Sequence, residues 1–226
     1  MARSRTDDPR TPPDASADAG LLSRAVRRDL VDLNRNYLEL GLSLAGEADP
    51  LFAWTPSVRQ EIAAAEPAVR ARMAECPFSL FRICLSGTAG SVPDGHRVED
   101  HGARAPATGR TPGCLEFSSS ALFAAWRLAD SAPLAARIVF GLTPSEELLL
   151  NELSPSQVGA LAADPAVVRA RWPDRVRFWS ALRTAAESAT PAALQWAHCM
   201  GICMIDGGPD TARGEDPGAA PGRRRR

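Results

Sequence analysis

LLSRAVRRDLVDLNRNYLELGLSLA, residues 21–45, is the clearest helix in the sequence. Its apolar residues step by three or four, at Val26, Leu30, Leu33, Tyr37, Leu40 and Leu44. From Leu30 onward the period is about 3.5 residues, which keeps one apolar stripe facing a partner helix. Leu38 and Leu42 widen this face, and the pattern is equally typical of a core-facing helix and of an obligate dimer. The residues that we expect to form an association surface are Leu30, Leu33, Tyr37, Leu40 and Leu44.

Pairs of a hydroxyl residue and proline predict where further helices begin. Each of four pairs places a side-chain acceptor at the N-cap and proline at the first helical position: Thr55-Pro56, Thr143-Pro144, Ser154-Pro155 and Thr190-Pro191. Glu146 and Gln157 stand three residues after the second and third caps and complete capping boxes. Residues 78–85 are the one short segment that favours a strand. We therefore predict an all-α fold, or nearly so.

Composition divides the chain into two candidate helical units, residues 21–85 and residues 114–206. Residues 86–113 between them contain many Gly and Pro and almost no large apolar residue, which predicts a flexible linker. Residues 1–20 and the Arg-ending tail 207–226 are rich in Pro and charge, and we expect both to be disordered. The expected architecture is two small helical units joined by a flexible linker, with disordered termini.

Two segments of the chain resemble each other: TPSVRQEIAAAEPAVRAR, residues 55–72, and SPSQVGALAADPAVVRAR, residues 154–171. Both begin with hydroxyl-Pro-Ser and end on Arg-Ala-Arg. A bias toward Ala and Arg also produces short similarities, but it does not place proline at the first helical position twice. We therefore favour a duplicated helical unit. The pairs Glu66-Pro67 and Asp164-Pro165 predict a further short helix inside each segment.

The composition also limits the compartment and the partners. The formal net charge of −1 argues against a protein that coats nucleic acid by bulk attraction. Five cysteines at irregular spacing, without a signal peptide, suit a reducing compartment better than a disulfide framework. No stretch approaches the ~18 consecutive apolar residues of a membrane span. We expect a cytoplasmic protein without a membrane partner.

Candidate metal and catalytic residues are few. Cys199 and Cys203 in WAHCMGICMI offer two soft ligands beside His198, but a zinc site needs more, and burial in the core is the favoured interpretation. DGHRVEDH, residues 94–101, lies in the expected linker, where nothing fixes the geometry of a site. Ser118–Ser120 lacks a nucleophile elbow. We expect no catalytic residue, no metal and no cofactor, and therefore no enzyme.

Arginines and aromatic residues are interleaved between residues 169 and 183. The arginines are candidates for phosphate contacts, with Trp172, Phe178 and Trp179 packed beneath them. The alternative is a solvated helix face over a core. The candidate DNA-binding residues are Arg171, Arg175 and Arg177.

Residues 32–40, DLNRNYLEL, match the signature D-[IL]-N-x-x-Y-L-x-L, and the chain resembles the family of the flagellar transcriptional regulator FlhD. In the second half, Gly141-Leu142 resembles the family's turn into a short helix, and Leu153-Ser154-Pro155 resembles its next helix start. Arg171-Trp172 closes this segment, as Phe81-Arg82 closes the first copy. The two matches together cover most of the expected helical chain.

The chain departs from the family pattern in three ways. It contains two FlhD-like copies where the family is usually a single copy. The first copy is incomplete, because it passes from Leu44 to Thr55 without the middle helix. Ser79 and Val168 stand where the family carries a cysteine that can crosslink dimers. Two copies in one chain imply either a homodimer or an intramolecular pseudo-dimer.

The resemblance implies a non-enzymatic transcriptional regulator that activates flagellar genes. It further implies assembly with a FlhC-like partner on promoter DNA, where the partner carries the zinc site and makes most of the DNA contact. The alternative function is a helical protein–protein interaction module, or an anti-activator, without direct DNA binding.

Overall fold

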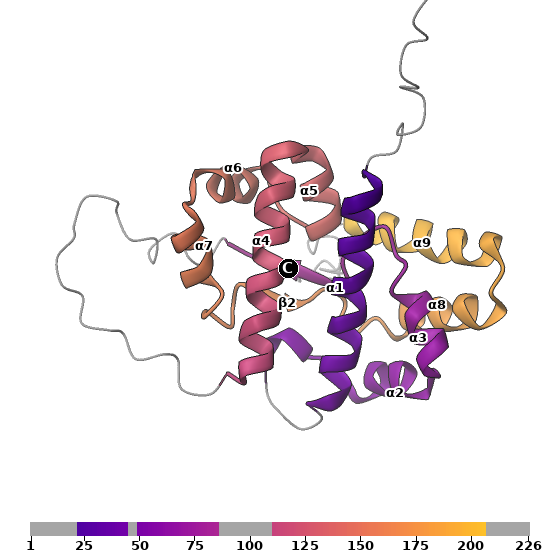
Figure 1. The fold of residues 1–226 in the computed structure, drawn as a ribbon. Helices are drawn as coiled ribbons and strands as arrows, with labels where there is room; N and C mark the ends of the chain where they lie inside the picture. Colours follow the sequence, from indigo (N-terminus) through magenta and orange to yellow (C-terminus); the bar gives the residue numbers. More distant parts are fainter. Residues whose placement is uncertain (1–21, 45–48, 86–109, 207–226) are drawn as a thin grey trace, which may run out of the picture.

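The computed structural model describes residues 22–44, 49–85 and 110–206, whose arrangement is shown in Figure 1. Within these ranges the fold is mostly helical, as the sequence predicts, with one pair of short strands. The two expected disordered ends lie outside the described residues, and so does the expected linker except for residues 110–113.

The two halves of the chain contain different sets of elements. The first half contains α1 (Arg24–Ser43), the 3-10 helix η1 (Pro50–Phe52), α2 (Pro56–Ala64), α3 (Pro67–Met73) and β1 (Phe81–Ile83). The second half contains α4 (Pro112–Ser131), α5 (Pro133–Phe140), α6 (Pro144–Glu152), α7 (Pro155–Leu161), β2 (Val168–Ala170), α8 (Val176–Ser188) and α9 (Pro191–Asp206). The described part between α1 and α2 holds only η1, at the place where the sequence lacks a middle helix.

Local side-chain chemistry begins the helices where the sequence predicts. Thr55, Thr143 and Ser154 each accept a hydrogen bond from a backbone N–H of the first turn. Glu146 and Gln157 return the bond to the N-cap backbone, so both predicted capping boxes are present. Each box satisfies two donors that the first helical turn leaves without intrahelical partners.

One predicted helix start is wrong: Asp164-Pro165 opens a turn that leads into β2. The Asp164 carboxylate accepts a hydrogen bond from Ala166 N over 2.8 Å, which stabilises the turn. Val167 and Val168 follow and are fully buried, and β-branched residues favour extended backbone. The Arg-Ala-Arg endings of the two similar segments therefore differ, because the first lies in α3 and the second at the end of β2.

The helices α1 and α4 lie side by side through the middle of the molecule and run in opposite directions (Figure 1). α5, α6 and α7 pack against α4, while α8 packs against α2, α3 and α9. The strands join the two halves as an antiparallel pair, with Phe81 opposite Ala170 and Ile83 opposite Val168. Both halves therefore contribute to one body.

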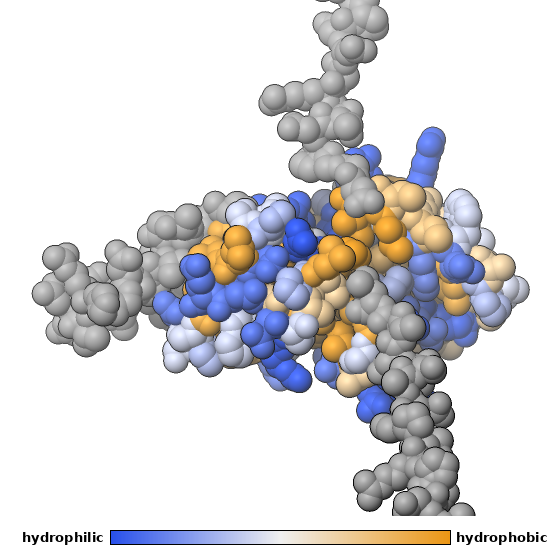
Figure 2. All heavy atoms as spheres, turned by 90° about the horizontal axis from the view of Figure 1, so that it is seen from above, coloured by the Kyte–Doolittle hydropathy of each residue, from blue (hydrophilic) through white to orange (hydrophobic). Residues whose placement is uncertain are grey.

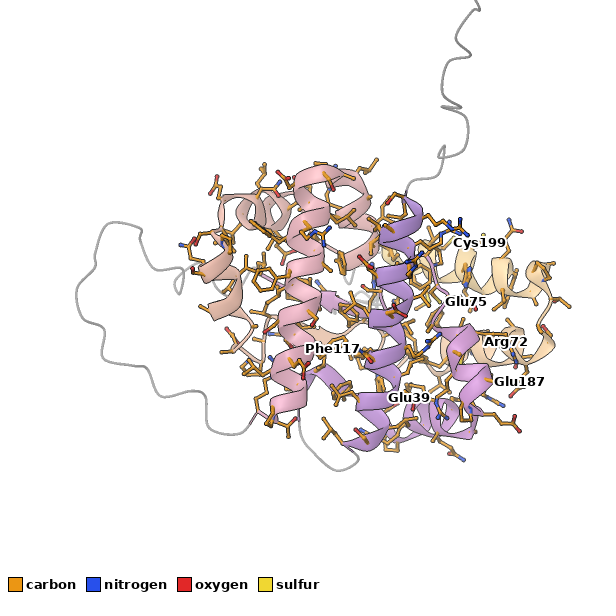
Figure 3. All side chains as sticks on the ribbon, viewed as in Figure 1. Glu39, Arg72, Glu75, Phe117, Glu187 and Cys199 are labelled. Atoms are coloured by element: carbon orange, nitrogen blue, oxygen red, sulfur yellow. The ribbon has the colours of Figure 1, made fainter. Side chains whose placement is uncertain are left out.

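One buried apolar cluster extends through both halves, and Tyr37 of α1 lies within it. The Tyr37 ring centroid is 5.6 Å from that of Phe81 and 5.9 Å from that of Phe117 on α4. Phe117 is labelled beside α1 in Figure 3. The Tyr37 hydroxyl donates to Leu51 O and accepts from Trp54 Nε1, both over 3.0 Å. Burial raises the pKa of Tyr37 above its ordinary value.

Asn34 fixes α1 against the segment that precedes β1. Its side-chain nitrogen donates to Ala74 O over 3.2 Å and to Phe78 O over 2.9 Å. Its side-chain oxygen accepts from Leu80 N over 2.9 Å. A buried amide with these partners satisfied specifies one position of the helix relative to the segment.

Candidate functional site

The predicted association stripe on α1 is used mainly inside the chain. Leu30, Leu33 and Tyr37 are 2, 8 and 0% exposed, because α4 and the rest of the core cover them. Leu40 and Leu44 are half-buried. The expectation that this stripe joins separate chains is therefore corrected, since the same face packs against the second half of its own chain.

Arg171 is a half-buried residue whose guanidinium is held by the protein's own backbone. Its guanidinium donates to the backbone oxygens of Ser79, Val139 and Ile138 over 3.1, 2.7 and 3.1 Å. It also lies 5.1 Å from the ring centroid of Trp172. Burial lowers the pKa of Arg171 below its ordinary value. The predicted DNA contact at this residue is not supported by the structure, because three backbone oxygens already accept from its guanidinium.

Arg175 and Arg177 remain at the surface around the start of α8. The Arg175 Nε lies 3.8 Å from Oδ1 of Asp174, and both side chains are largely exposed. Arg177 lines a shallow hollow between α8 and α9, together with Trp196, which is 61% exposed. Both arginines are accessible to an anion, but Arg177 is the one basic residue among those that line the hollow.

The helix α9 turns its cysteines away from the core, which corrects their expected burial. Ala197 and Gly201 are buried instead, and Gly201 lies directly against the Phe78 ring, where a side chain would clash. Cys199 and Cys203 lie on the opposite side and are exposed, as Figure 3 shows for Cys199 on the outer part of the molecule. The close approach of the helix to Phe78 decides which face is buried.

The candidate metal and nucleophilic residues do not form a cluster. Among residues 22–44, 49–85 and 110–206, no group of three or more His, Cys, Asp or Glu side chains is placed to hold a metal ion. Ser118 is buried in α4, and its Oγ has no hydrogen-bond partner in that part of the chain. Residues 94–101, the other candidate metal segment, lie outside the described residues.

A groove with a volume of about 650 Å³ opens between the first half of α1 and the second half of α4, next to α5. Its floor consists of buried apolar side chains: Leu30, Leu33, Leu128, Val139 and Phe140. Its walls carry half-buried apolar side chains: Val26, Phe123, Ala124 and Trp126. Figure 2 looks onto the end of the molecule where α1 begins, and hydrophobic surface (orange) lies there among hydrophilic surface (blue). An apolar hollow within a polar surround is typical of a binding site.

The rim of this groove is mostly acidic. Asp29 and Asp32 stand on α1, about one turn apart, and Asp130 stands on the α4 wall. Arg127 is the single basic side chain in the lining. All four side chains are exposed, and none of them has an ion-pair partner within the described part of the chain. The rim therefore presents three carboxylates against one guanidinium. The sequence alone does not predict this groove, because its two walls come from different halves.

A scan against protein-family models, a search of curated proteins and a search of solved structures each found no match for this chain. In the ranges that the structure describes, no helix is both long enough and apolar enough to cross a membrane.

Proposed function

We propose that the chain is a non-enzymatic transcriptional regulator of the FlhD type, in which two FlhD-like copies pair within one chain. It acts by assembling with a FlhC-like partner on promoter DNA of flagellar genes. The partner makes most of the DNA contact, and this chain stabilises the complex.

The observation that supports this proposal is the antiparallel pairing of β1 with β2. Ser79 and Val168 stand at the position of the family's cysteine in the first and the second copy. Two residues further along, Phe81 and Ala170 are therefore equivalent positions of the two copies. Phe81 and Ala170 are the residues that stand opposite each other in the ladder. Two copies related by a twofold axis meet in this way, because each residue near the axis faces its own counterpart.

The long helices support the same relation. α1 carries the FlhD-like signature, and α4, the first helix of the second copy, lies antiparallel beside it. The signature residues Asn34 and Tyr37 are buried and hydrogen-bonded to residues of the first half. Tyr37 also lies against Phe117 of α4, so the second half covers the α1 face that the family resemblance assigns to dimer formation, as a partner chain would.

The charges support an assisting role on DNA. Arg171 is engaged by backbone carbonyls, which leaves Arg175 and Arg177 exposed among the predicted phosphate contacts. At a formal net charge of −1, bulk attraction for the phosphate backbone is weak. A subunit whose partner supplies most of the DNA contact has this charge pattern.

Co-expression with a FlhC-like protein encoded beside this gene tests the proposal. We expect the two proteins to co-purify and the complex to shift a promoter fragment, whereas the chain alone does not. We also expect the isolated chain to be monomeric by light scattering, because its dimer face is filled. Failure of the two proteins to associate, or a dimer that forms through the α1 stripe, contradicts the proposal.

The second candidate is a helical interaction module, or an anti-activator, that does not touch DNA. The engagement of the Arg171 guanidinium by backbone oxygens favours it, because this occupies one of the three predicted phosphate contacts. The double variant Arg175→Gln, Arg177→Gln separates the two functions. If the complex with the double variant binds the promoter more weakly than the unchanged complex, and this difference becomes smaller as salt is raised, the regulator is favoured. An unchanged affinity favours the interaction module.

A further inference from the structure

The groove between α1 and α4 has the dimensions of a docking site for a helix. Its lining extends from Val26 to Asn36 on α1 and from Ser120 to Ser131 on α4. At 1.5 Å per residue this length is roughly 15 Å, or about three helical turns. Two helices that lie side by side receive a third in the groove between them, because ridges of side chains on each helix insert between those of its neighbours.

The floor and the rim select different parts of the incoming helix. Phe123 and Trp126 are half-buried, so their remaining exposed apolar surface loses contact with water when an apolar side chain covers it. Asp29, Asp32 and Asp130 lack ion-pair partners among the described residues, so they attract cations at the edges of the groove. Acidic side chains of an incoming helix are repelled at the same edges, so the groove discriminates between basic and acidic helices.

We propose that this groove binds a basic amphipathic helix of another protein. The apolar face of that helix lies on the floor, and its Lys or Arg side chains lie against Asp29, Asp32 and Asp130. The proposal stands on the groove alone and applies to a partner of any function, so it goes beyond the FlhD-type role.

A pair of synthetic peptides tests the proposal on the full-length chain. The probe is an amphipathic peptide of about 14 residues, roughly four helical turns, with Leu at helical spacing and Arg at the flanking positions. The matched peptide carries Glu in place of every Arg. Fluorescence anisotropy at low and high salt measures binding. We expect the Arg peptide to bind, more weakly at high salt, and the Glu peptide not to bind.

Two matched variants locate the binding. The triple variant Asp29→Asn, Asp32→Asn, Asp130→Asn removes three rim charges at nearly constant side-chain volume. The control variant removes three exposed carboxylates outside the groove: Glu75→Gln, Glu116→Gln and Glu152→Gln. Both variants have the same net charge, so a difference between them is local. We expect the affinity for the Arg peptide to fall roughly 5- to 100-fold in the rim variant, as the loss of three exposed ion pairs predicts, and to stay nearly unchanged in the control.

Equal binding of the Arg and Glu peptides, or an equal loss in the rim and control variants, overturns the proposal. Binding that survives Ala124→Trp, which fills the groove from one wall, overturns it as well. Replacement of Arg223–Arg226 by Ser tests whether the chain's own basic tail competes with the peptide for the groove. If the Arg peptide binds only after that replacement, the occupant is the tail and not a partner helix. Failure of the FlhC-like protein to associate contradicts the proposed function but leaves these peptide results intact, so the two failures are distinguishable.

Discussion

Replacing Arg171 by Met is expected to destabilise the fold while it leaves the surface unchanged. Methionine follows the aliphatic part of the arginine side chain but lacks the guanidinium, which donates to Ser79 O, Val139 O and Ile138 O. Two of these oxygens belong to the last turn of α5, where carbonyls have no intrahelical donor and a cation is favoured. Arg171→Met therefore removes a partner from the end of α5 and from the segment before β1.

The magnitude follows from which oxygens lose their donor. Val139 O keeps a hydrogen bond from Ser79 N over 3.0 Å, so the loss falls mainly on Ser79 O and Ile138 O. A hydrogen bond to a charged group contributes about 1.5–3 kcal/mol. Removal of the guanidinium also removes the cost of its own burial, which offsets part of the loss. We expect the free energy of unfolding to fall by about 3–4 kcal/mol, a large part of the roughly 5–15 kcal/mol of a typical domain.

Urea unfolding followed by tryptophan fluorescence measures this change. Arg177→Met is the control, because Arg177 is exposed and its replacement is expected to alter the free energy of unfolding by less than about 0.5 kcal/mol. A similarly small change for Arg171→Met refutes the reasoning. If Arg171→Met instead weakens promoter binding by the complex at unchanged stability, the guanidinium is a phosphate contact, as the sequence alone predicts.

Asn34→Leu is expected to lower the free energy of unfolding by about 2–4 kcal/mol in denaturant titration, because three buried backbone groups lose their partner. Gly201→Val places a side chain against the Phe78 ring and is expected to cost about 1–3 kcal/mol. Gly159→Ala, which meets nothing within 4 Å, is expected to stabilise the chain by up to ~1 kcal/mol; denaturant titration measures both glycine variants. Burial lowers the pKa of His198 from 6.5, so the unfolded chain binds that proton first as pH falls through 6.5. The free energy of unfolding is therefore expected to fall on acidification, and to fall less in His198→Gln than in the unchanged chain. Urea midpoints of both proteins at about pH 7.5 and about pH 5.5 measure this difference. If both proteins lose the same stability between these pH values, the pH dependence comes from other groups.

The helix starts were predictable because their chemistry is local. Thr143 and Glu146 are three residues apart, and the capping box that they form needs no other part of the chain. The apolar stripe on residues 21–45 likewise predicts a helix and its buried face from spacing alone. Spacing does not reveal whether the covering helix belongs to the same chain, so the choice between a core-facing helix and a dimer stayed open until α4 was seen beside α1.

Arg171 and Cys199 were misplaced because their surroundings come from distant segments. The Arg171 guanidinium donates to carbonyls of α5 and of the segment before β1, and each of these hydrogen-bond acceptors is more than thirty residues away in sequence. The exposure of Cys199 depends on Gly201, which lets α9 approach Phe78 by its other face. The strand β2 was missed as well, since its three residues pair only with β1 in the other half. The spacing of apolar residues within one segment does not predict contacts with distant segments.

The ladder position at which Phe81 faces Ala170 has a consequence for the evolution of the chain. In an assembly of identical subunits, a residue near the axis meets its own copy, so one mutation changes both sides at once. In a single chain each side is encoded separately. The Phe81 ring lies 5.1 Å from that of Phe117 and 6.1 Å from that of Phe140, while its counterpart across the ladder is a methyl group. If the halves are the paired copies that we propose, a large residue opposite a small one is a combination that a symmetric assembly does not permit, and a single chain leaves each half free to diverge.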